Sequence, residues 1–112
     1  MANVTGSFTA TGQSASFAPR VGARATNTGE FNIWLSGTAV ATVQLEKSPD
    51  NGVTWYAVYA GGTKLYSWPY SNNGSGDNIN ETAQEPEQGV LYRLNCTGYT
   101  SGTLAYSLTG PQ

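Results

Sequence analysis

The sequence predicts an all-β protein that folds as an antiparallel β-sandwich. Three observations support this class: apolar and polar residues alternate with a period of two, no stretch shows the period of an amphipathic helix, and turn signals recur about every ten residues. The pattern indicates about seven to nine short strands. Both predicted hairpins have one apolar and one polar face, which favours two packed sheets. A jelly-roll order and an immunoglobulin-like order fit this pattern equally well.

Residues 38–59 are predicted to form the central hairpin. In its first arm, alternate residues are apolar, and Val40 is the one apolar residue on the polar face. In its second arm, four apolar or aromatic residues again share one face. The residues that share the apolar faces are Ala39, Ala41, Val43 and Leu45 in the first arm, and Val53, Trp55, Ala57 and Tyr59 in the second.

The turn of this hairpin carries the pattern S-x-D-x-G-x-T-W. Pro49 fixes its own φ, and Asn51 and Gly52 tolerate the positive φ that hairpin turns need. The pattern resembles the Asp-box of sialidase-type propellers, in which it is a structural hairpin repeated across the blades. One copy cannot build a propeller of about four or more blades. We therefore expect a structural turn whose Trp55 packs on the core, not a glycosidase site. The matching residues are Ser48, Asp50, Gly52, Thr54 and Trp55.

Two strands are predicted before the central hairpin, at residues 3–11 and 30–36, because both stretches alternate apolar and polar residues. Between them, residues 12–29 are small, glycine-rich and nearly unpatterned. We expect a loose N-terminal arm there, with at most a short strand near residues 14–18. Trp34 lies on the otherwise polar face of its strand, so it predicts a second contact surface, against either the other sheet or a partner.

The chain after the hairpin contains an expected edge element and two expected closing strands. Residues 63–70 include Pro69, which has no N–H to donate, so they are predicted as an edge strand or an ordered loop. Residues 71–80 are predicted as a flexible polar connection and residues 81–88 as an acidic loop. The two closing strands are predicted at residues 89–97 and 102–109. Residues 98–102 between them are predicted to form the turn of a second hairpin.

Length and charge narrow the classes of function. The 112 residues are expected to form one domain over residues 1–112, and 11% of them are charged, against about 25% in average proteins. The net charge is −2, and the cationic residues form no cluster beyond Arg20 and Arg24, which argues against nucleic acid. The single Cys96 is expected as a small buried residue. Neither a signal peptide nor a long apolar run is visible, so we expect a protein made in a cytoplasm, without a membrane partner.

The residue inventory does not support an enzyme. There is no histidine, which removes the Ser-His-Asp triad, the Cys-His pair and imidazole metal ligation. Three acids lie close together, but their spacing matches no calcium loop, and Ile79 stands where a ligand would be needed. We expect these acids to be solvated, and we predict no catalytic residue, metal or cofactor. The acids are Glu81, Glu85 and Glu87.

Aromatic and charged side chains give the candidate binding residues. The aromatic residues of 66–70 are spaced by two, and tyrosine and tryptophan are enriched at protein interfaces. Rings that cover the core, a protein interface and a sugar platform remain open as explanations for this segment. The candidate interface residues are Arg20, Arg24, Trp34, Tyr66, Trp68, Tyr70, Glu81, Glu85 and Glu87.

Two runs of this chain resemble small proteins encoded among bacteriophage head genes. VQLEKSPDNGVTW contains the S-x-D-x-G-x-T-W strand end, and EPEQGVLYRLNCTGYTSGTLAYSL follows with an E-x-G-x-x-Y-R-x-x-C segment and a short hairpin. The resemblance covers about residues 31–108 and is to the capsid decoration, or cement, proteins of short-tailed phages.

The resemblance implies a jelly-roll protein on the outer surface of a virion, where a homodimer staples neighbouring capsomers against internal DNA pressure. It implies the major capsid protein as the partner and supplies no catalytic residues. We expect the arm at residues 12–29 and the loop at residues 67–87 to contact that partner. The alternative function is a carbohydrate-binding or receptor-binding module of a tail tip, which would use the aromatic residues of 66–70.

Overall fold

The computed structural model describes residues 3–19, 29–64, 67–71 and 78–110, and for residue 60 and residues 67–71 it describes the backbone alone. The described residues form strands and turns and contain no helix, so the predicted all-β class is confirmed. The strands are β1 (Val4–Phe8), β2 (Gly12–Gln13), β3 (Glu30–Gly37), β4 (Val40–Ser48), β5 (Tyr56–Ala57), β6 (Tyr59–Ala60), β7 (Thr63–Lys64), β8 (Ser67–Ser71), β9 (Ile79–Gln84), β10 (Leu91–Ser101) and β11 (Leu104–Thr109).

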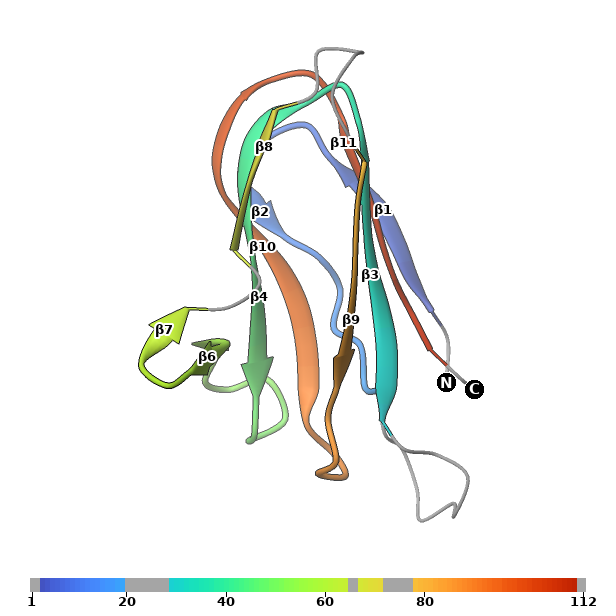
Figure 1. The fold of residues 1–112 in the computed structure, drawn as a ribbon, viewed down its shortest axis with the longest axis vertical. Helices are drawn as coiled ribbons and strands as arrows, with labels where there is room; N and C mark the ends of the chain where they lie inside the picture. Colours follow the sequence, from blue (N-terminus) through green and yellow to red (C-terminus); the bar gives the residue numbers. More distant parts are fainter. Residues whose placement is uncertain (1–2, 20–28, 65–66, 72–77, 111–112) are drawn as a thin grey trace.

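Two antiparallel sheets face each other across one hydrophobic core (Figure 1). Sheet A has the order β1-β11-β3-β9. Sheet B has the order β2-β10-β4, and both β5 and β8 pair with β4, at opposite ends of that strand. Six connections pass from one sheet to the other: β1–β2, β2–β3, β3–β4, β8–β9, β9–β10 and β10–β11. This is the order of a jelly roll with two Greek keys, so the predicted sandwich is confirmed and its strand order is now defined.

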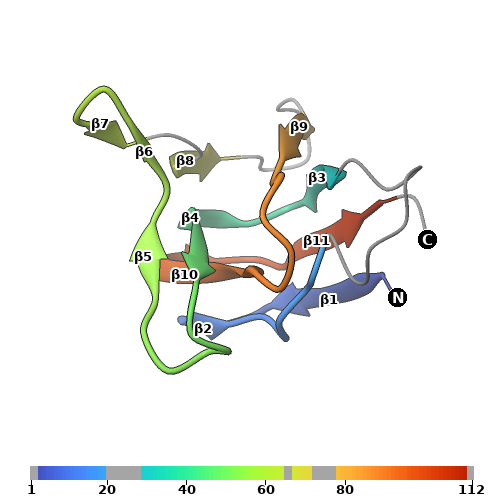
Figure 2. The ribbon, with the colours of Figure 1, turned by 90° about the horizontal axis from the view of Figure 1, so that it is seen from below.

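The small hairpin of β6 and β7 lies beside the sandwich and not within either sheet (Figure 2). Its turn is formed by Gly61 and Gly62, both with positive φ. Among the described residues, β8 pairs with β4 alone, with Pro69 opposite Thr42. The prediction of an edge strand at this proline is therefore confirmed.

The predicted second hairpin is wrong, because β10 and β11 belong to different sheets. β10 continues to Ser101 in sheet B, and the chain crosses to sheet A at residues 102–103. This crossing lies next to the one from β3 to β4, and the Thr38 N–H donates to the Thr103 carbonyl at 3.0 Å. A Cβ on Gly102 would lie 2.5 Å from the Thr38 carbonyl oxygen, so the crossing needs glycine. The alternation in the sequence is the same whether the next strand pairs within the sheet or packs opposite it.

The core is formed by the inward faces that the sequence predicts. The alternate apolar residues of β3, β4, β10 and β11 are buried, and the rings of Phe17, Phe31 and Tyr92 stack at one end. The ring centroids are 5.5 Å apart for Phe17–Phe31 and 4.8 Å apart for Phe31–Tyr92. Completely or nearly completely buried side chains include Phe17, Phe31, Ile33, Leu35, Val43, Leu45, Leu94, Cys96, Leu104 and Leu108.

The first part of the expected loose arm is anchored to sheet B. β2 pairs with β10, and Phe17 forms a two-way backbone bridge with Tyr92, at N–O distances of 2.8 and 2.7 Å. The Ser14 Oγ also accepts the Leu94 N–H at 2.9 Å. The expectation of a loose arm is therefore wrong for residues 12–19, whereas residues 20–28 lie outside the described part of the chain. The anchoring of this segment could not be predicted from its small residues, because it depends on one buried ring and a few backbone hydrogen bonds.

The structure has strand β9 at residues 79–84, where the sequence predicts the end of a polar connection and part of an acidic loop, so that prediction is wrong. Residues 79–84 pair with residues 30–35 of β3, with Glu30 opposite Gln84 and Leu35 opposite Ile79. Of this strand, Ala83 is buried and Ile79 packs partly against the core. The strand lacks the apolar alternation that marks the others because it lies at the edge of its sheet, where polar residues remain wet on both sides.

The S-x-D-x-G-x-T-W turn is a structural hairpin, as predicted. The Ser48 Oγ donates to Asp50 Oδ1 at 2.7 Å and accepts the Gly52 N–H at 2.9 Å. Asp50 Oδ1 also accepts the Thr54 N–H at 2.8 Å, which holds the pKa of this carboxyl below its ordinary value. Asn51 has a φ of 62°. The side chains of the motif are therefore used to fix the turn itself.

The second arm of this hairpin is shorter than predicted. Two of its residues pair with β4, and Val53 and Tyr59, expected on the apolar face, are 82% and 58% exposed. Trp55 lies outside the core cluster, so its expected core packing is also wrong. Its ring stacks under the guanidinium of Arg93, whose Cζ is 4.3 Å from the ring centroid. The half-buried Arg93, on β10, offers this ring a cation–π partner outside the core.

Candidate functional site

The outer face of sheet A is a broad surface of small, uncharged polar side chains. Strand register places Trp34 between Ser107 on β11 and Asn80 on β9, and Thr5 of β1 continues the same row. Among the described residues of this face, Glu30 is the charged one. Apart from Trp34 and Ala105, the other side chains of this face carry hydroxyl or amide groups. We call this surface the A face; it comprises Thr5, Ser7, Glu30, Asn32, Trp34, Ser36, Asn80, Thr82, Gln84, Ala105, Ser107 and Thr109.

Trp34 is the large apolar side chain of the A face. It is 44% exposed, and its indole Nε1 donates to the Thr109 Oγ1 at 2.9 Å. This hydrogen bond satisfies the polar atom of the ring and fixes its orientation, so the remaining ring surface is presented to solvent. The sequence predicts that Trp34 contacts either the other sheet or a partner. The structure excludes the other sheet, because the ring lies on the outside of the sandwich.

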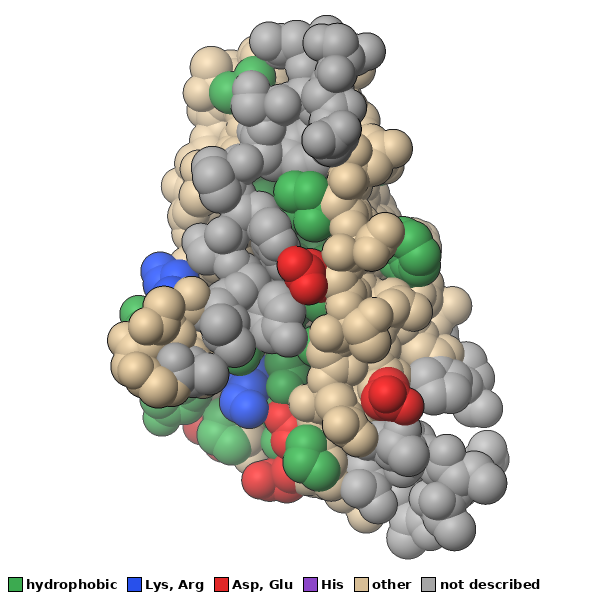
Figure 3. Space-filling view, in the orientation of Figure 1, with side chains coloured by type: hydrophobic (Ala, Val, Ile, Leu, Met, Phe, Trp, Pro, Cys, Tyr) green, Lys and Arg blue, Asp and Glu red, His purple; other side chains and the backbone are tan. Residues whose placement is uncertain are grey.

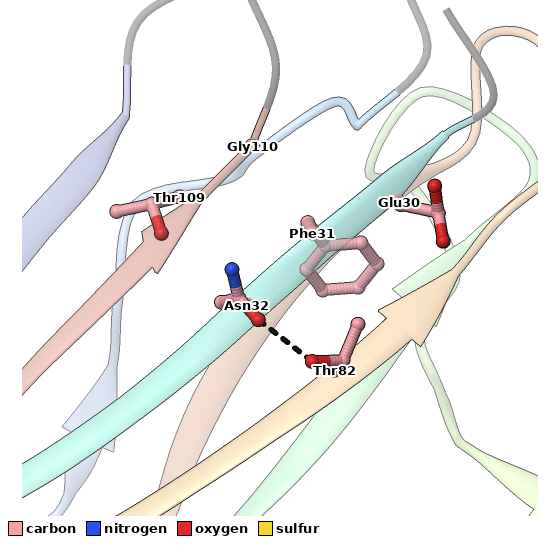
Figure 4. A pocket seen from close by; sticks show the side chains of 6 residues that line it. All are labelled: Glu30, Phe31, Asn32, Thr82, Thr109 and Gly110. Carbon is pink, nitrogen blue, oxygen red and sulfur yellow. Dashed lines mark hydrogen bonds between the residues drawn. The ribbon is translucent and has the colours of Figure 1, made fainter.

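A shallow depression of about 470 Å³ lies next to Trp34 on the A face. Figure 4 shows that side chains from three neighbouring strands surround it: Glu30 and Asn32 from β3, Thr82 from β9, and Thr109 from β11. The Thr82 hydroxyl donates to Asn32 Oδ1 at 2.7 Å, which holds these two side chains side by side. The depression therefore presents fixed hydroxyl and amide groups next to an exposed ring.

Few charged side chains interrupt the polar surface of the molecule. In Figure 3, the few acidic and basic side chains of the described residues lie in the middle and lower part of this face, and the other described side chains there are uncharged. Such a surface offers no electrostatic capture of a charged ligand from a distance. It favours contacts made by shape, hydrogen bonds and the one exposed ring of the A face.

The structure does not bring the predicted aromatic residues together. Trp68 and Tyr70 lie on β8 in sheet B, opposite Val43 and Ala41, whereas Trp34 is on the outside of sheet A. Arg20, Arg24 and Tyr66 lie outside the described residues, and the side chains of β8 are not described. Trp34 is therefore the predicted aromatic candidate whose environment is known.

The three predicted loop acids have three different environments. Glu81 is exposed on β9, and Glu87 is exposed in the following turn. Glu85 is 5% exposed, so its prediction as a solvated acid is wrong. Its Oε1 accepts the Tyr92 hydroxyl at 2.7 Å and Lys47 Nζ at 3.1 Å, and its Oε2 accepts the Glu87 N–H at 3.0 Å. This carboxylate is used inside the molecule.

A second buried carboxylate lies on the outer face of sheet B. Glu46, expected on the polar face of the first arm, is 6% exposed and accepts hydrogen bonds from three side chains: Gln44 at 2.6 Å, Arg93 at 2.8 Å and Asn95 at 2.9 Å. Burial raises its pKa, but these three hydrogen bonds and the Arg93 charge lower it by more, so the net pKa lies below its ordinary value. The polar groups here satisfy one another, which indicates a structural role.

Residues 29–64, 78–110 and the other described positions hold no group of three or more metal-ligating side chains. No helix long and apolar enough to span a membrane occurs in the described part of the chain. Comparison of the chain with protein-family models, with curated proteins and with solved structures found no match.

The residues of the depression could not be identified from sequence alone. Asn32, Thr82 and Thr109 are ordinary polar residues that are far apart in the chain. The one available signal was the alternation of side chains along a strand, which places Asn32 on the same face as Trp34. Since β9 was not predicted as a strand, nothing in the sequence placed Thr82 beside them.

Proposed function

We propose that this chain is a structural protein of a bacteriophage virion that binds the outside of the capsid and staples neighbouring capsomers against internal DNA pressure. The observation that supports this best is the A face: a broad, nearly uncharged surface on one side of a jelly-roll sandwich, with an oriented tryptophan near its middle. The major capsid protein is the proposed partner and the outer capsid surface the proposed location.

The composition of the A face suits a protein partner. Interfaces place aromatic side chains near their centre, deplete charged residues there, and form about one hydrogen bond per 100–200 Å². Trp34 provides the aromatic centre, and the surrounding threonine, serine and asparagine side chains provide donors and acceptors on a rigid sheet. We expect the A face, instead of the arm at residues 12–19, to make the main contact, because that segment is anchored within the sandwich.

The stapling mechanism requires that the protein bind the assembled shell better than it binds free capsid subunits. Only this difference in affinity shifts the equilibrium toward the shell. A contact that spans two capsomers meets this condition, since both halves of its binding surface exist together only in the lattice. Each contact can then be modest in strength, because binding at one point raises the effective concentration at the next.

Immunogold labelling of virions whose genome encodes this chain tests the proposed location. We expect gold evenly distributed over the head. Gold confined to the tail tip would contradict the capsid proposal and favour the second candidate described below. Particles without any label, when the antibody detects the denatured chain in the infected lysate, would contradict both virion roles.

Trp34→Ala is expected to weaken binding to purified shells that lack this chain by about thirtyfold, as for a central aromatic residue of an interface. Co-sedimentation of the variant with such shells measures this. Tyr56→Ala is the matched control, because it removes an aromatic side chain that is 56% exposed but lies away from the A face. We expect the control to bind within twofold of the unmodified protein. Equal binding by both variants would exclude the A face as the docking surface.

The depression beside Trp34 also favours a second candidate function, the binding of a neutral glycan at a tail tip. An aromatic ring beside fixed hydroxyl and amide groups can stack on and hydrogen-bond to a sugar. This function would use Trp34 in place of the aromatic residues of 66–70. A glycan array separates the two candidates: binding that is lost in Trp34→Ala supports the glycan, and an array without signal opposes it.

A further inference from the structure

The outer edge of β1 lacks the protection found at the other sheet edges in the described part of the chain. Open edges recruit foreign strands unless charges, prolines, bulges or short length prevent it. β9 carries Glu81, β8 carries Pro69, and β2 and β5 are two residues long. β1 has five residues without charge or proline, and it pairs with β11 without a bulge. Its free edge is therefore suited to strand addition.

The sequence of β1 is also self-complementary about Gly6. In an antiparallel pair of two copies with a two-fold axis at this residue, Thr5 of each copy lies opposite Ser7 of the other, and Val4 lies opposite Phe8. The faces agree, because Thr5 and Ser7 are exposed on the A face while Val4 and Phe8 are buried toward the core. A slip by one residue would place apolar residues opposite polar ones and break this match.

We propose that two copies of this chain join through β1 and so extend sheet A into one continuous sheet with four strands from each copy. Main-chain hydrogen bonds and two Thr–Ser pairs across the junction stabilise the dimer. The two-fold axis is perpendicular to the sheet, so both A faces point to the same side. The dimer therefore presents two Trp34 side chains on one surface, whichever partner that surface binds.

The expected result is that the purified full chain sediments with twice its mass of 11.8 kDa. In T5K/S7K, lysines lie opposite each other at both junction pairs, and we expect the dimer dissociation constant to rise at least about tenfold. In T5K/S7E, each lysine lies opposite a glutamate, so the dimer is retained. Added salt should strengthen the T5K/S7K dimer and weaken the T5K/S7E dimer.

The paired charge variants make the proposal falsifiable without a capsid and independently of what the A face binds. N80K/Q84K carries the same two charges on β9, at the opposite edge of sheet A, and should remain a dimer. Circular dichroism and thermal unfolding confirm that each variant is folded. A monomer at all concentrations of the unmodified chain would overturn the proposal, as would a T5K/S7K dimer of unchanged strength. Dissociation of T5K/S7E as complete as that of T5K/S7K would exclude the axis at Gly6.

Discussion

Replacing Phe17 with alanine is expected to lower the free energy of unfolding by about 3–5 kcal/mol, the usual cost of truncating a fully buried phenylalanine. Phe17 is 1% exposed and stacks on Phe31, which in turn stacks on Tyr92. Its removal leaves a cavity next to the ring of Phe31 at the end of the core where Phe31 also contacts Tyr92. Urea unfolding followed by circular dichroism measures the loss.

The control for this prediction is Ser16→Ala, one residue earlier in the same segment. Ser16 is exposed, and its substitution should change stability by less than about 0.5 kcal/mol. A loose arm at residues 12–19 would make the two variants equivalent. Equal stability of Phe17→Ala and Ser16→Ala would therefore contradict the anchoring of this segment to sheet B.

The strand faces could be predicted from sequence because burial on one side imposes a period of two. Phe31 and Leu45 follow this pattern on strands from different sheets, and both are buried. The pairing of strands could not be predicted in the same way. Leu94 and Leu104 continue one apolar pattern, yet the chain changes sheets between them. Periodicity indicates which side of a strand is buried. Whether β11 joins the sheet of β10 or the opposite sheet depends on the bend at Gly102.

The candidate site was predictable to the extent of one residue. Trp34 interrupts the polar face of a well-patterned strand, so strand parity alone marks it as a contact residue. Thr82 was not predictable, because β9 carries one buried side chain and its composition is that of a loop. A site built across strands needs the register between them, and register is set by long-range pairing that a single polar strand does not encode.

Glu85→Ala is expected to lower the free energy of unfolding by about 3 kcal/mol. The substitution removes the buried hydrogen bond from the Tyr92 hydroxyl and also the bonds from Lys47 Nζ and the Glu87 N–H. The Lys47 side chain is 42% exposed, so its ion pair contributes little, and the buried bond to Tyr92 contributes more. Glu87→Ala, two residues on and exposed, should cost less than about 0.5 kcal/mol.

A double-mutant cycle separates this contact from other effects of the substitution. Tyr92→Phe removes the hydroxyl and retains the ring that stacks on Phe31. If the hydrogen bond between Tyr92 and Glu85 stabilises the fold, the two substitutions together should cost about 1 kcal/mol less than the sum of the single losses. Strict additivity would show that the carboxylate acts through its other bonds.

The same carboxylate predicts how stability depends on pH. Burial raises the pKa of Glu85, but the hydrogen bonds from Tyr92 and the Glu87 N–H and the charge of Lys47 outweigh it, so the folded-state pKa lies below the ordinary value of 4.5. In the unfolded chain the carboxyl has its ordinary pKa, so between the folded and the unfolded pKa the unfolded chain binds more protons than the folded chain. The stabilisation is therefore complete above about pH 4.5 and is lost as pH falls through the folded pKa.

Glu85→Gln cannot titrate, and its stability should fall less steeply with acid than that of the unmodified protein. Glu46 also has a lowered pKa and leaves a residual slope in this variant. Identical slopes below pH 4.5 would mean that Glu85 is not ionised within the fold.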